Sequence, residues 1–234
     1  MSLDVNKQLN SNIEVLRIGN ELQPLIVVDN FIAQPQALIE YALHQHDVLP
    51  AAGHYPGYRS DTPDYYARTV SEQYANLICQ TFQLDMADIK QVESYYSLVA
   101  TPVEQLSVVQ RLPHFDKPNP KEIAIIHYLC NDTHGGTSFY RHRSSGMEFV
   151  DVQRSSAYLR KVREEVRTIG LPLPPAYING NTALFELVTS IPAVFNRALI
   201  YRCSSLHSGS ISDDYEFDFN PHTGRFTVAS FLHK

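Results

Sequence analysis

The 234-residue sequence has only three cysteines, no long apolar run and no surplus of positive charge. Cys79, Cys130 and Cys203 are odd in number and far apart, which argues against a disulfide framework or a zinc ribbon and fits reduced thiols in the cytoplasm. No apolar run approaches the roughly 20 residues of a membrane span, and the first residues lack the apolar core of a signal peptide. We therefore predict a cytoplasmic protein that does not interact with membranes.

The formal net charge is −6, and the 19 Lys and Arg residues are scattered among 25 Asp and Glu residues. This distribution argues against nucleic acid as a partner. The length suits one domain over residues 1–234 with a sizeable core. We expect residues 1–90 to form an N-terminal helical support region and residues 91–234 to form the core.

In the N-terminal region, the apolar run 25–31 predicts a strand. Apolar residues at helical spacing predict a helix from about Pro35, where proline fits a first turn, and another from about Ser71, a suitable cap. The Gly-, Pro- and Tyr-rich stretch 51–66 is typical of a loop. These segments predict N-terminal α/β elements.

After residue 90 the hydrophobic period changes to two, which predicts many short strands. The predicted strands are 95–100, 105–112, 123–129, 137–140, 184–188, 198–203 and 225–232. Residues 151–180 interrupt them with a helical pattern in which Leu159, Val162, Val166 and Ile169 share one face, followed by a stop signal at Gly170. Short strands separated by turns predict a β-sandwich or barrel, here with one helical insertion.

His114, Phe115 and Asp116 form a His-x-Asp motif at the end of an apolar alternating run. In extended backbone, residues i and i+2 point to the same face, so the imidazole of His114 and the carboxylate of Asp116 would project side by side. Two such groups supply part of a metal site. A third ligand from a distant strand would complete it.

His207 is the preferred third ligand because it follows the apolar strand 198–203 and precedes Ser-Gly. Other histidines are weaker candidates for the third ligand because of their positions in the sequence. These are His127, which lies mid-strand and suits packing, His134, which lies in a polar turn, His142, which lies between two arginines, and His222. Two histidines and one carboxylate on one face of a metal, with other positions open, is the arrangement of non-haem Fe(II) oxygenases.

Arg225 opens the alternating strand near the C-terminus. It is either a rim residue paired with an acid or a clamp for a ligand carboxylate, which guanidinium can hold with two parallel hydrogen bonds. Thr227 would share its face and could add a hydroxyl. Arg197 and Arg202 are alternatives for the clamp.

Together, His114-x-Asp116, His207 and Arg225-x-Thr227 resemble the Fe(II)/2-oxoglutarate-dependent oxygenase superfamily over roughly residues 92–234. Tyr128-Leu129 before the turn at Gly135-Gly136 is similar to the prolyl-hydroxylase-like branch, and other segments resemble uncharacterised bacterial members. Arg225 lies further from His207 than is usual in the superfamily, so residues 211–224 are expected to form a loop insertion.

The resemblance implies a mainly β fold with flanking helices, the double-stranded β-helix or cupin-like jelly-roll. It implies Fe(II) held by His114, Asp116 and His207, and 2-oxoglutarate held by Arg225, Tyr128 and Thr227. With O2, such an enzyme would oxidise a small molecule or amino-acid-derived metabolite, and the presence of Asp116 favours hydroxylation over halogenation.

Substrate contacts are expected from the tyrosine-rich loop, at Tyr58 and Arg59, and from Arg141 after the Gly-Gly strand. Ordinary packing and a solvated basic rim are the competing interpretations of these residues. Two other functions stay open: a non-catalytic jelly-roll binding or sensor module, and another cupin-type metalloenzyme, which would not need the Arg225 clamp. An exposed sheet edge could support a homodimer.

Overall fold

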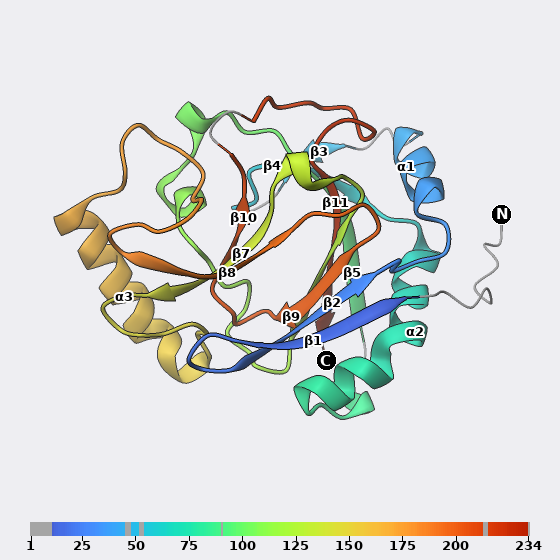
Figure 1. Cartoon of the computed structure of the whole chain (residues 1–234), viewed down its shortest axis with the longest axis horizontal. Coiled ribbons are helices and arrows are strands. Elements are labelled where there is room, and N and C mark those ends of the chain that lie inside the picture. The colour runs from blue at the N-terminus through green and yellow to red at the C-terminus, as the bar shows by residue number, and fades with distance from the viewer. Residues whose placement is uncertain (1–10, 45–47, 52–53, 90, 213–214, 234) are drawn as a thin grey trace.

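In the part of the chain that the structure describes, two antiparallel β-sheets form the centre and three α-helices lie around them (Figure 1). The computed structural model describes residues 11–44, 48–51, 54–89, 91–212 and 215–233. In these residues no helix is both long and apolar enough to cross a membrane. The mainly β fold with flanking helices is confirmed.

The larger sheet has eight strands in the described part of the chain, and strands from both ends of the sequence meet in it. In spatial order they are β1 (Asn12–Ile18), β2 (Gln23–Asp29), β9 (Ala198–Arg202), β6 (Ile123–Tyr128), β11 (Phe226–His233), β5 (Gln91–Val99), β4 (Gly57–Asp61) and β3 (Leu49–Pro50). The smaller sheet contains β10 (His207–Ser210), β7 (Gly136–His142) and β8 (Phe185–Pro192).

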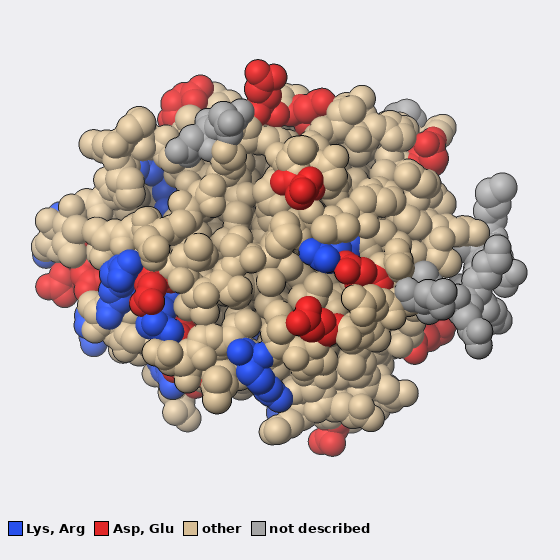
Figure 2. Space-filling view, in the orientation of Figure 1, with Lys and Arg blue, Asp and Glu red and all other residues tan. Residues whose placement is uncertain are grey.

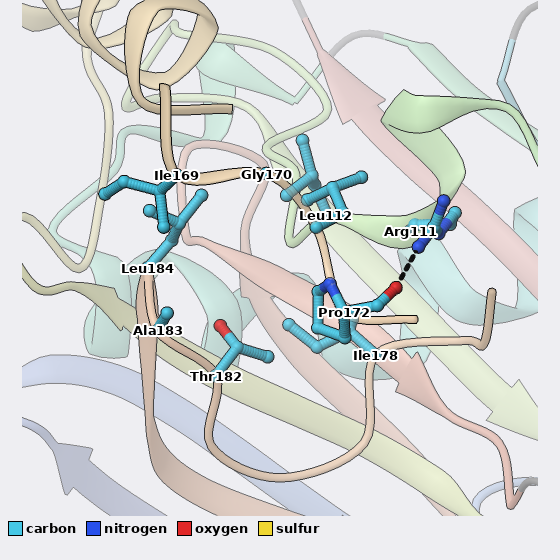
Figure 3. A pocket seen from close by; sticks show the side chains of 10 residues that line it. Arg111, Leu112, Ile169, Gly170, Pro172, Ile178, Thr182, Ala183 and Leu184 are labelled. Carbon is cyan, nitrogen blue, oxygen red and sulfur yellow. Dashed lines mark hydrogen bonds between the residues drawn. The ribbon is translucent and has the colours of Figure 1, made fainter. Parts of the chain in front are cut away.

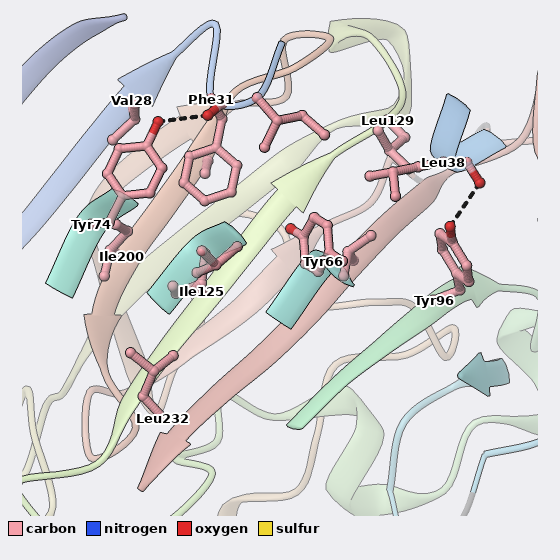
Figure 4. Close-up of a cluster of buried hydrophobic side chains, with 14 of the residues drawn as sticks. Val28, Phe31, Leu38, Tyr66, Tyr74, Tyr96, Ile125, Leu129, Ile200 and Leu232 are labelled. Atoms are coloured by element: carbon pink, nitrogen blue, oxygen red, sulfur yellow. Dashed lines mark hydrogen bonds between the residues drawn. The ribbon is translucent and has the colours of Figure 1, made fainter. Parts of the chain in front are cut away.

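Helices α1 (Pro35–Leu43) and α2 (Asp64–Phe82) cover the outer face of the larger sheet. Their apolar residues pack against alternate residues of β2, β5, β6, β9 and β11 in one buried cluster (Figure 4). The central strand β6 is buried almost throughout, as its continuous apolar run predicted. This layer fixes which residues of each strand point outward and which point towards the smaller sheet, because strand side chains alternate.

Helix α3 (Val152–Ile169) is the predicted insertion between strands β7 and β8, and it lies beside the smaller sheet. Asp151 caps it by accepting a hydrogen bond from the Arg154 backbone N–H, at 2.9 Å. Its buried residues are Tyr158 and Val162. The predicted apolar face was partly wrong, because Leu159 and Ile169 are exposed.

Two segments differ from the sequence prediction. Residues 105–112 do not form a strand: the short 3₁₀ helix Val103–Gln105 ends at their start, and a second one, Val108–Arg111, lies within them. A capping box between Ser107 and Gln110 stabilises the second helix, and this local pairing competes with extended structure. The predicted loop 51–66 contains strand β4 and the start of α2, which begins at Asp64 and not near Ser71.

Strand β4 can join the sheet because Gly57 lacks a side chain. A Cβ on Gly57 would lie 2.0 Å from the Leu98 carbonyl oxygen of the neighbouring strand β5. Only glycine permits so close an approach of two backbones. Glycine in a strand is an unfavourable signal, which explains why composition suggested a loop.

Candidate metal centre

Three of the predicted site residues meet between the two sheets. His114 Nε2 lies 3.7 Å from Asp116 Oδ1, and His207 Nε2 lies 3.7 Å from Asp116 Oδ2. One ligand atom from each residue falls within 4.8 Å of the other two, and no other such group of His, Cys, Asp or Glu occurs in the described chain. The structure therefore brings together side chains that are 93 positions apart in the sequence, as 207 is from 114.

The connection between β9 and β10 holds all three residues in place. His114 and His207 exchange both backbone hydrogen bonds of an antiparallel bridge, at 2.9 and 2.8 Å. The Asp116 N–H donates to the Cys203 carbonyl at 2.8 Å. The His207 ring nitrogen Nδ1 lies 2.9 Å from the Ser205 carbonyl oxygen. Backbone contacts to residues 203–207 thus fix the positions of the three side chains, although His114 does not end a strand as predicted.

The protonation of the two rings suits a cation. A carbonyl oxygen can only accept, so Nδ1 of His207 carries the proton, and in the neutral ring Nε2 keeps its lone pair. Desolvation and, next, the neighbouring His207 lower the pKa of His114 to about 4. His114 is therefore neutral at pH 7, although about half of its side chain is solvent-accessible.

The donor set fits a divalent transition metal. Two imidazole nitrogens and one carboxylate are the ligands of mononuclear Fe(II) sites with open positions. Two donors that each lie about 2.1 Å from one cation are at most about 4.2 Å apart. Each histidine Nε2 lies 3.7 Å from an Asp116 oxygen, and the three ligand atoms all lie within 4.8 Å of one another. Small side-chain rotations would bring them to one ion.

Arg225 lies on the same interior, close to the strand that carries His207. A Cβ on Gly209, two residues after His207, would lie 3.4 Å from Arg225 Nη2. The Arg225 side chain is buried, and it donates to the backbone carbonyls of His134 (3.1 Å) and Gly136 (2.8 Å). Within the described residues no carboxylate lies within 4 Å of it, so its charge has no ionic partner there.

Tyr128 and Thr227 belong to one row of inward-facing residues across the larger sheet. Thr227 of β11 pairs with Tyr128 of β6 on one side and with Ser97 of β5 on the other. The Tyr128 hydroxyl lies 2.6 Å from Thr137 Oγ1 on the smaller sheet. Desolvation raises the pKa of Tyr128 to about 12, and the nearby charge of Arg225 opposes this rise. Both predicted cofactor residues thus face the same interior as Arg225.

Tyr201 is a site residue that the sequence did not reveal. Its ring centroid lies 4.8 Å from that of His207, and its buried hydroxyl has no hydrogen-bond partner among the described residues. Desolvation and then the Asp116 carboxylate raise the pKa of this phenol well above its usual value. Tyr201 is therefore a protonated donor near the metal ligands. The alternating pattern of strand 198–203 places every second side chain on the same face. Which face points inward cannot be decided without the pairing of the strand in the sheet.

The alternative arginines for the clamp are engaged elsewhere. Arg197 forms a two-point ion pair with Asp29, at 2.6 and 3.0 Å. Arg202 donates to the carbonyl of Phe82 at 2.8 Å and lies over the Phe82 ring. Of the three arginines considered, only Arg225 lies beside the metal cluster.

The three predicted substrate residues are in different places. Tyr58 pairs with Leu98, which packs in the outer cluster, so Tyr58 is on the opposite side of the sheet from the metal cluster. Arg141 is neutralised by Glu148, with Nε to Oε1 at 2.7 Å, and by Glu186 at 2.9 Å. Only Arg59 points to the interior. The substrate interpretation of Tyr58 and Arg141 therefore has no support in their geometry.

The competing histidines have other roles in the fold. His127 is fully buried between the Tyr66 hydroxyl and Asn196 Oδ1, each 3.1 Å away. His142 is buried and lies 2.7 Å from Glu165 of α3. His134 lies in the predicted turn, and its Nε2 is 2.7 Å from the Thr223 carbonyl oxygen.

The surface and cavities add two observations. On the face shown in Figure 2, basic and acidic side chains are interspersed, and the basic ones gather towards α3. A cavity of about 250 Å³ lies between the end of α3 and the segment before His114. Arg111 and Leu112, Ile169–Pro172 and Ile178 with Thr182–Leu184 line it (Figure 3). Its lining contains none of the metal-cluster residues.

Several solved structures are similar to this chain. The carbocyclase SnoK from nogalamycin biosynthesis, a non-haem α-ketoglutarate-dependent enzyme, aligns with a TM-score of 0.50 and 11% identity over 91% of this chain and 80% of its own. HygX from Streptomyces hygroscopicus with nickel and 2-oxoglutarate bound aligns with a TM-score of 0.44 and 10% identity, over 90% and 83% of the two chains. An N-substituted L-amino acid dioxygenase from Burkholderia ambifaria AMMD gives 0.45 and 11%, over 97% and 96%.

The likeness to SnoK supports the double-stranded β-helix, and at this identity it supports the fold alone. No curated protein matches the sequence. One family model matches residues 9–232, nearly the whole chain. The protein therefore belongs to the family of unknown function DUF6445.

Proposed function

We propose that the protein is an Fe(II)- and 2-oxoglutarate-dependent oxygenase that hydroxylates a small molecule. The observation that carries this proposal is the position of Arg225. A buried guanidinium without an ionic partner lies beside two histidines and an aspartate that converge on one point. A metal site alone would not need this cation, whereas a metal-chelating dicarboxylate needs both.

In this proposal His114, Asp116 and His207 hold Fe(II). Arg225 binds the distal carboxylate of 2-oxoglutarate through its free guanidinium nitrogen, and Tyr128 and Thr227 line the same end of the site. Bound iron and 2-oxoglutarate supply the oxidising chemistry with O2, which yields succinate and carbon dioxide. Asp116 would take the coordination position that a halide needs, which favours hydroxylation.

The remaining contributions come from the surrounding side chains. The hydrogen bond from His207 Nδ1 to the Ser205 carbonyl would keep Nε2 directed towards the metal. Metal-ligating histidines generally use their other ring nitrogen for such an orienting hydrogen bond. The Tyr201 hydroxyl is a spare donor for a carboxylate oxygen of the co-substrate. Buried aromatic rings of Phe139 and Tyr201 exclude water beside His207, which strengthens the electrostatic interactions of the site.

An anaerobic titration of the purified protein with Fe(II) and 2-oxoglutarate tests the proposal. We expect a visible charge-transfer band that needs both components, and succinate formation once O2 is admitted. Asp116→Ala and His207→Ala should each abolish the band and the succinate, with unchanged circular dichroism. A band that persists in His207→Ala would remove that residue from the site. Metal binding without any response to 2-oxoglutarate would favour another cupin-type metalloenzyme instead.

The prolyl-hydroxylase-like branch, the single domain, the cytoplasmic location and a homodimer stay predictions. The same holds for the absence of nucleic-acid and membrane partners.

A further inference from the structure

Arg59 is a second cation on the inner face of the larger sheet. On strand β4 it pairs with Ser97 of β5, which continues the row through Thr227 to Tyr128. Its Nε donates to Ser97 Oγ at 3.3 Å. Among the described residues, neither terminal nitrogen has a hydrogen-bond partner, and no carboxylate lies within 4 Å. The end of this guanidinium is therefore available to a ligand.

Two aromatic rings hold Arg59 in this position. Its guanidinium carbon lies 4.6 Å from the centroid of the Tyr55 ring and 5.7 Å from that of Tyr95. Such cation–π contacts orient the planar group without neutralising its charge. A guanidinium that is fixed at Nε and on its faces has less conformational freedom to lose on binding, which favours affinity.

Arg59 also faces the interior that contains the metal cluster. The row that it shares with Ser97, Thr227 and Tyr128 leads to the end of the site assigned to 2-oxoglutarate. Arg59 thus lies at the β4 end of this row, while Arg225 lies near Gly209 of the strand that carries His207.

In a site that holds Fe(II) and 2-oxoglutarate, the positive charge of Arg59 would have no balancing negative charge. Divalent iron, the Asp116 carboxylate, the two carboxylates of 2-oxoglutarate and the Arg225 guanidinium sum to zero when both histidines are neutral. Arg59 then adds one positive charge in a partly buried site, where an unpaired charge is unfavourable. One singly charged anion would balance it, which favours a carboxylate over a doubly charged phosphate.

We propose that Arg59 is the residue that recognises the primary substrate, and that this substrate carries a carboxylate. The two free terminal nitrogens match a carboxylate with two parallel hydrogen bonds. The assignment rests on the proposed oxygenase function, because the charge balance includes iron and 2-oxoglutarate. Arg141, predicted for the same role, is already neutralised by Glu148 and Glu186.

Matched acids and amides test the proposal with the protein loaded with Zn(II), as an inert stand-in for iron, and saturating 2-oxoglutarate. The probes are hexanoate and 3-phenylpropionate with their carboxamides, and binding is measured by saturation-transfer NMR. We expect each acid to bind at least about tenfold more tightly than its amide, the difference expected for hydrogen bonds to a charged group. Arg59→Met should remove this difference. Arg68→Met, an exposed arginine on the outer helix α2, is the control of equal charge and should keep it.

The outcomes separate the two proposals. If acids and amides bind equally, if neither binds, or if Arg59→Met retains the preference, Arg59 does not select a carboxylate. If Arg59→Met instead weakens 2-oxoglutarate in the anaerobic Fe(II) titration, Arg59 belongs to the co-substrate site and the substrate assignment is wrong. If the wild-type protein shows no charge-transfer band with Fe(II) and 2-oxoglutarate, the oxygenase proposal itself fails.

Discussion

The two faces of the larger sheet bury the same residue type in opposite ways. On the outer face, under α1 and α2, each buried tyrosine hydroxyl has a partner: Tyr66 contacts His127, Tyr74 donates to the Phe31 carbonyl and Tyr96 donates to the Leu38 carbonyl (Figure 4). On the inner face, the buried Tyr201 hydroxyl has none in the described structure. Buried polar groups are almost always hydrogen-bonded, and in the proposed function the co-substrate would supply the missing partner of Tyr201.

Arginines show a related contrast, between those that are paired with carboxylates and one that is not. Arg197, just before β9, and Arg141, near the end of β7, form ion pairs with carboxylates. Arg225, on the inner face, donates only to backbone carbonyls. An unneutralised buried cation is unfavourable for folding. The paired arginines therefore stabilise the fold, whereas Arg225 and Tyr201 on the inner face keep a charge and a donor that an anionic ligand can use.

Among the substitutions that test this contrast, we expect the largest effect on ligand binding at Arg225. Arg225→Met should weaken 2-oxoglutarate binding on the order of 100-fold, because loss of one partner of a buried charged pair costs about 2–5 kcal/mol. Fe(II) binding and the thermal stability of the free protein should change little. Calorimetry of 2-oxoglutarate binding to the metal-loaded protein measures the first effect.

Arg197→Met is the matched control for Arg225→Met. It removes a cation that Asp29 already neutralises, so it should lower the free energy of unfolding by on the order of 1 kcal/mol and leave 2-oxoglutarate affinity unchanged. If the two variants weaken 2-oxoglutarate binding equally, the difference between an arginine paired with a carboxylate and an unpaired one has no functional meaning.

Much of this arrangement could be predicted from the sequence where signals are local. The continuous apolar run of β6 and the helical spacing of α1 and α3 gave the right element types. His-x-Asp predicted two ligands side by side, and the structure brings His114 and Asp116 into one cluster although no strand precedes them.

The remainder depended on register and on close contacts, which single-sequence patterns do not contain. Tyr201 faces inward because β9 pairs Tyr201 with Ala124 of β6, and a shift by one residue would reverse it. Tyr58 was assigned to the substrate and Arg59 with it, yet adjacent residues of one strand must point to opposite faces. Only the pairing with β5 decides which of the two lies inside.

The outer face should show a pH dependence that is independent of any ligand. Burial lowers the pKa of His127 to about 4, whereas in the unfolded chain it is about 6.5. The unfolded state therefore binds more protons below pH 6.5, and His127 reduces stability progressively from pH 6.5 down to about 4, by about 3 kcal/mol in total. Denaturant unfolding at a series of pH values measures this slope.

His127→Gln keeps hydrogen-bonding groups for Tyr66 and Asn196 but cannot titrate. It should be less stable than wild type at pH 7, and its stability should fall less steeply between pH 6.5 and 4. The difference in slope should correspond to the uptake of close to one proton fewer on unfolding. Its 2-oxoglutarate affinity should not change, since His127 lies on the outer face. An unchanged slope in this variant would show that His127 is not the group that titrates.

The smallest expected effect gives the most direct comparison of the two faces, because it removes one oxygen atom from each. Tyr74→Phe keeps the ring that stacks on Phe31 at 4.6 Å but loses the hydrogen bond to the Phe31 carbonyl, so it should cost about 1 kcal/mol of stability. Tyr201→Phe removes a hydroxyl without a partner in the described structure. It should leave the stability of the free protein unchanged or raise it, and it should weaken 2-oxoglutarate about tenfold, the value of one hydrogen bond to a charged acceptor. Urea unfolding and the anaerobic 2-oxoglutarate titration, applied to both variants, measure the two effects. A Tyr201→Phe protein that loses stability but retains 2-oxoglutarate affinity would place Tyr201 with the outer tyrosines, as a packing residue with no part in binding.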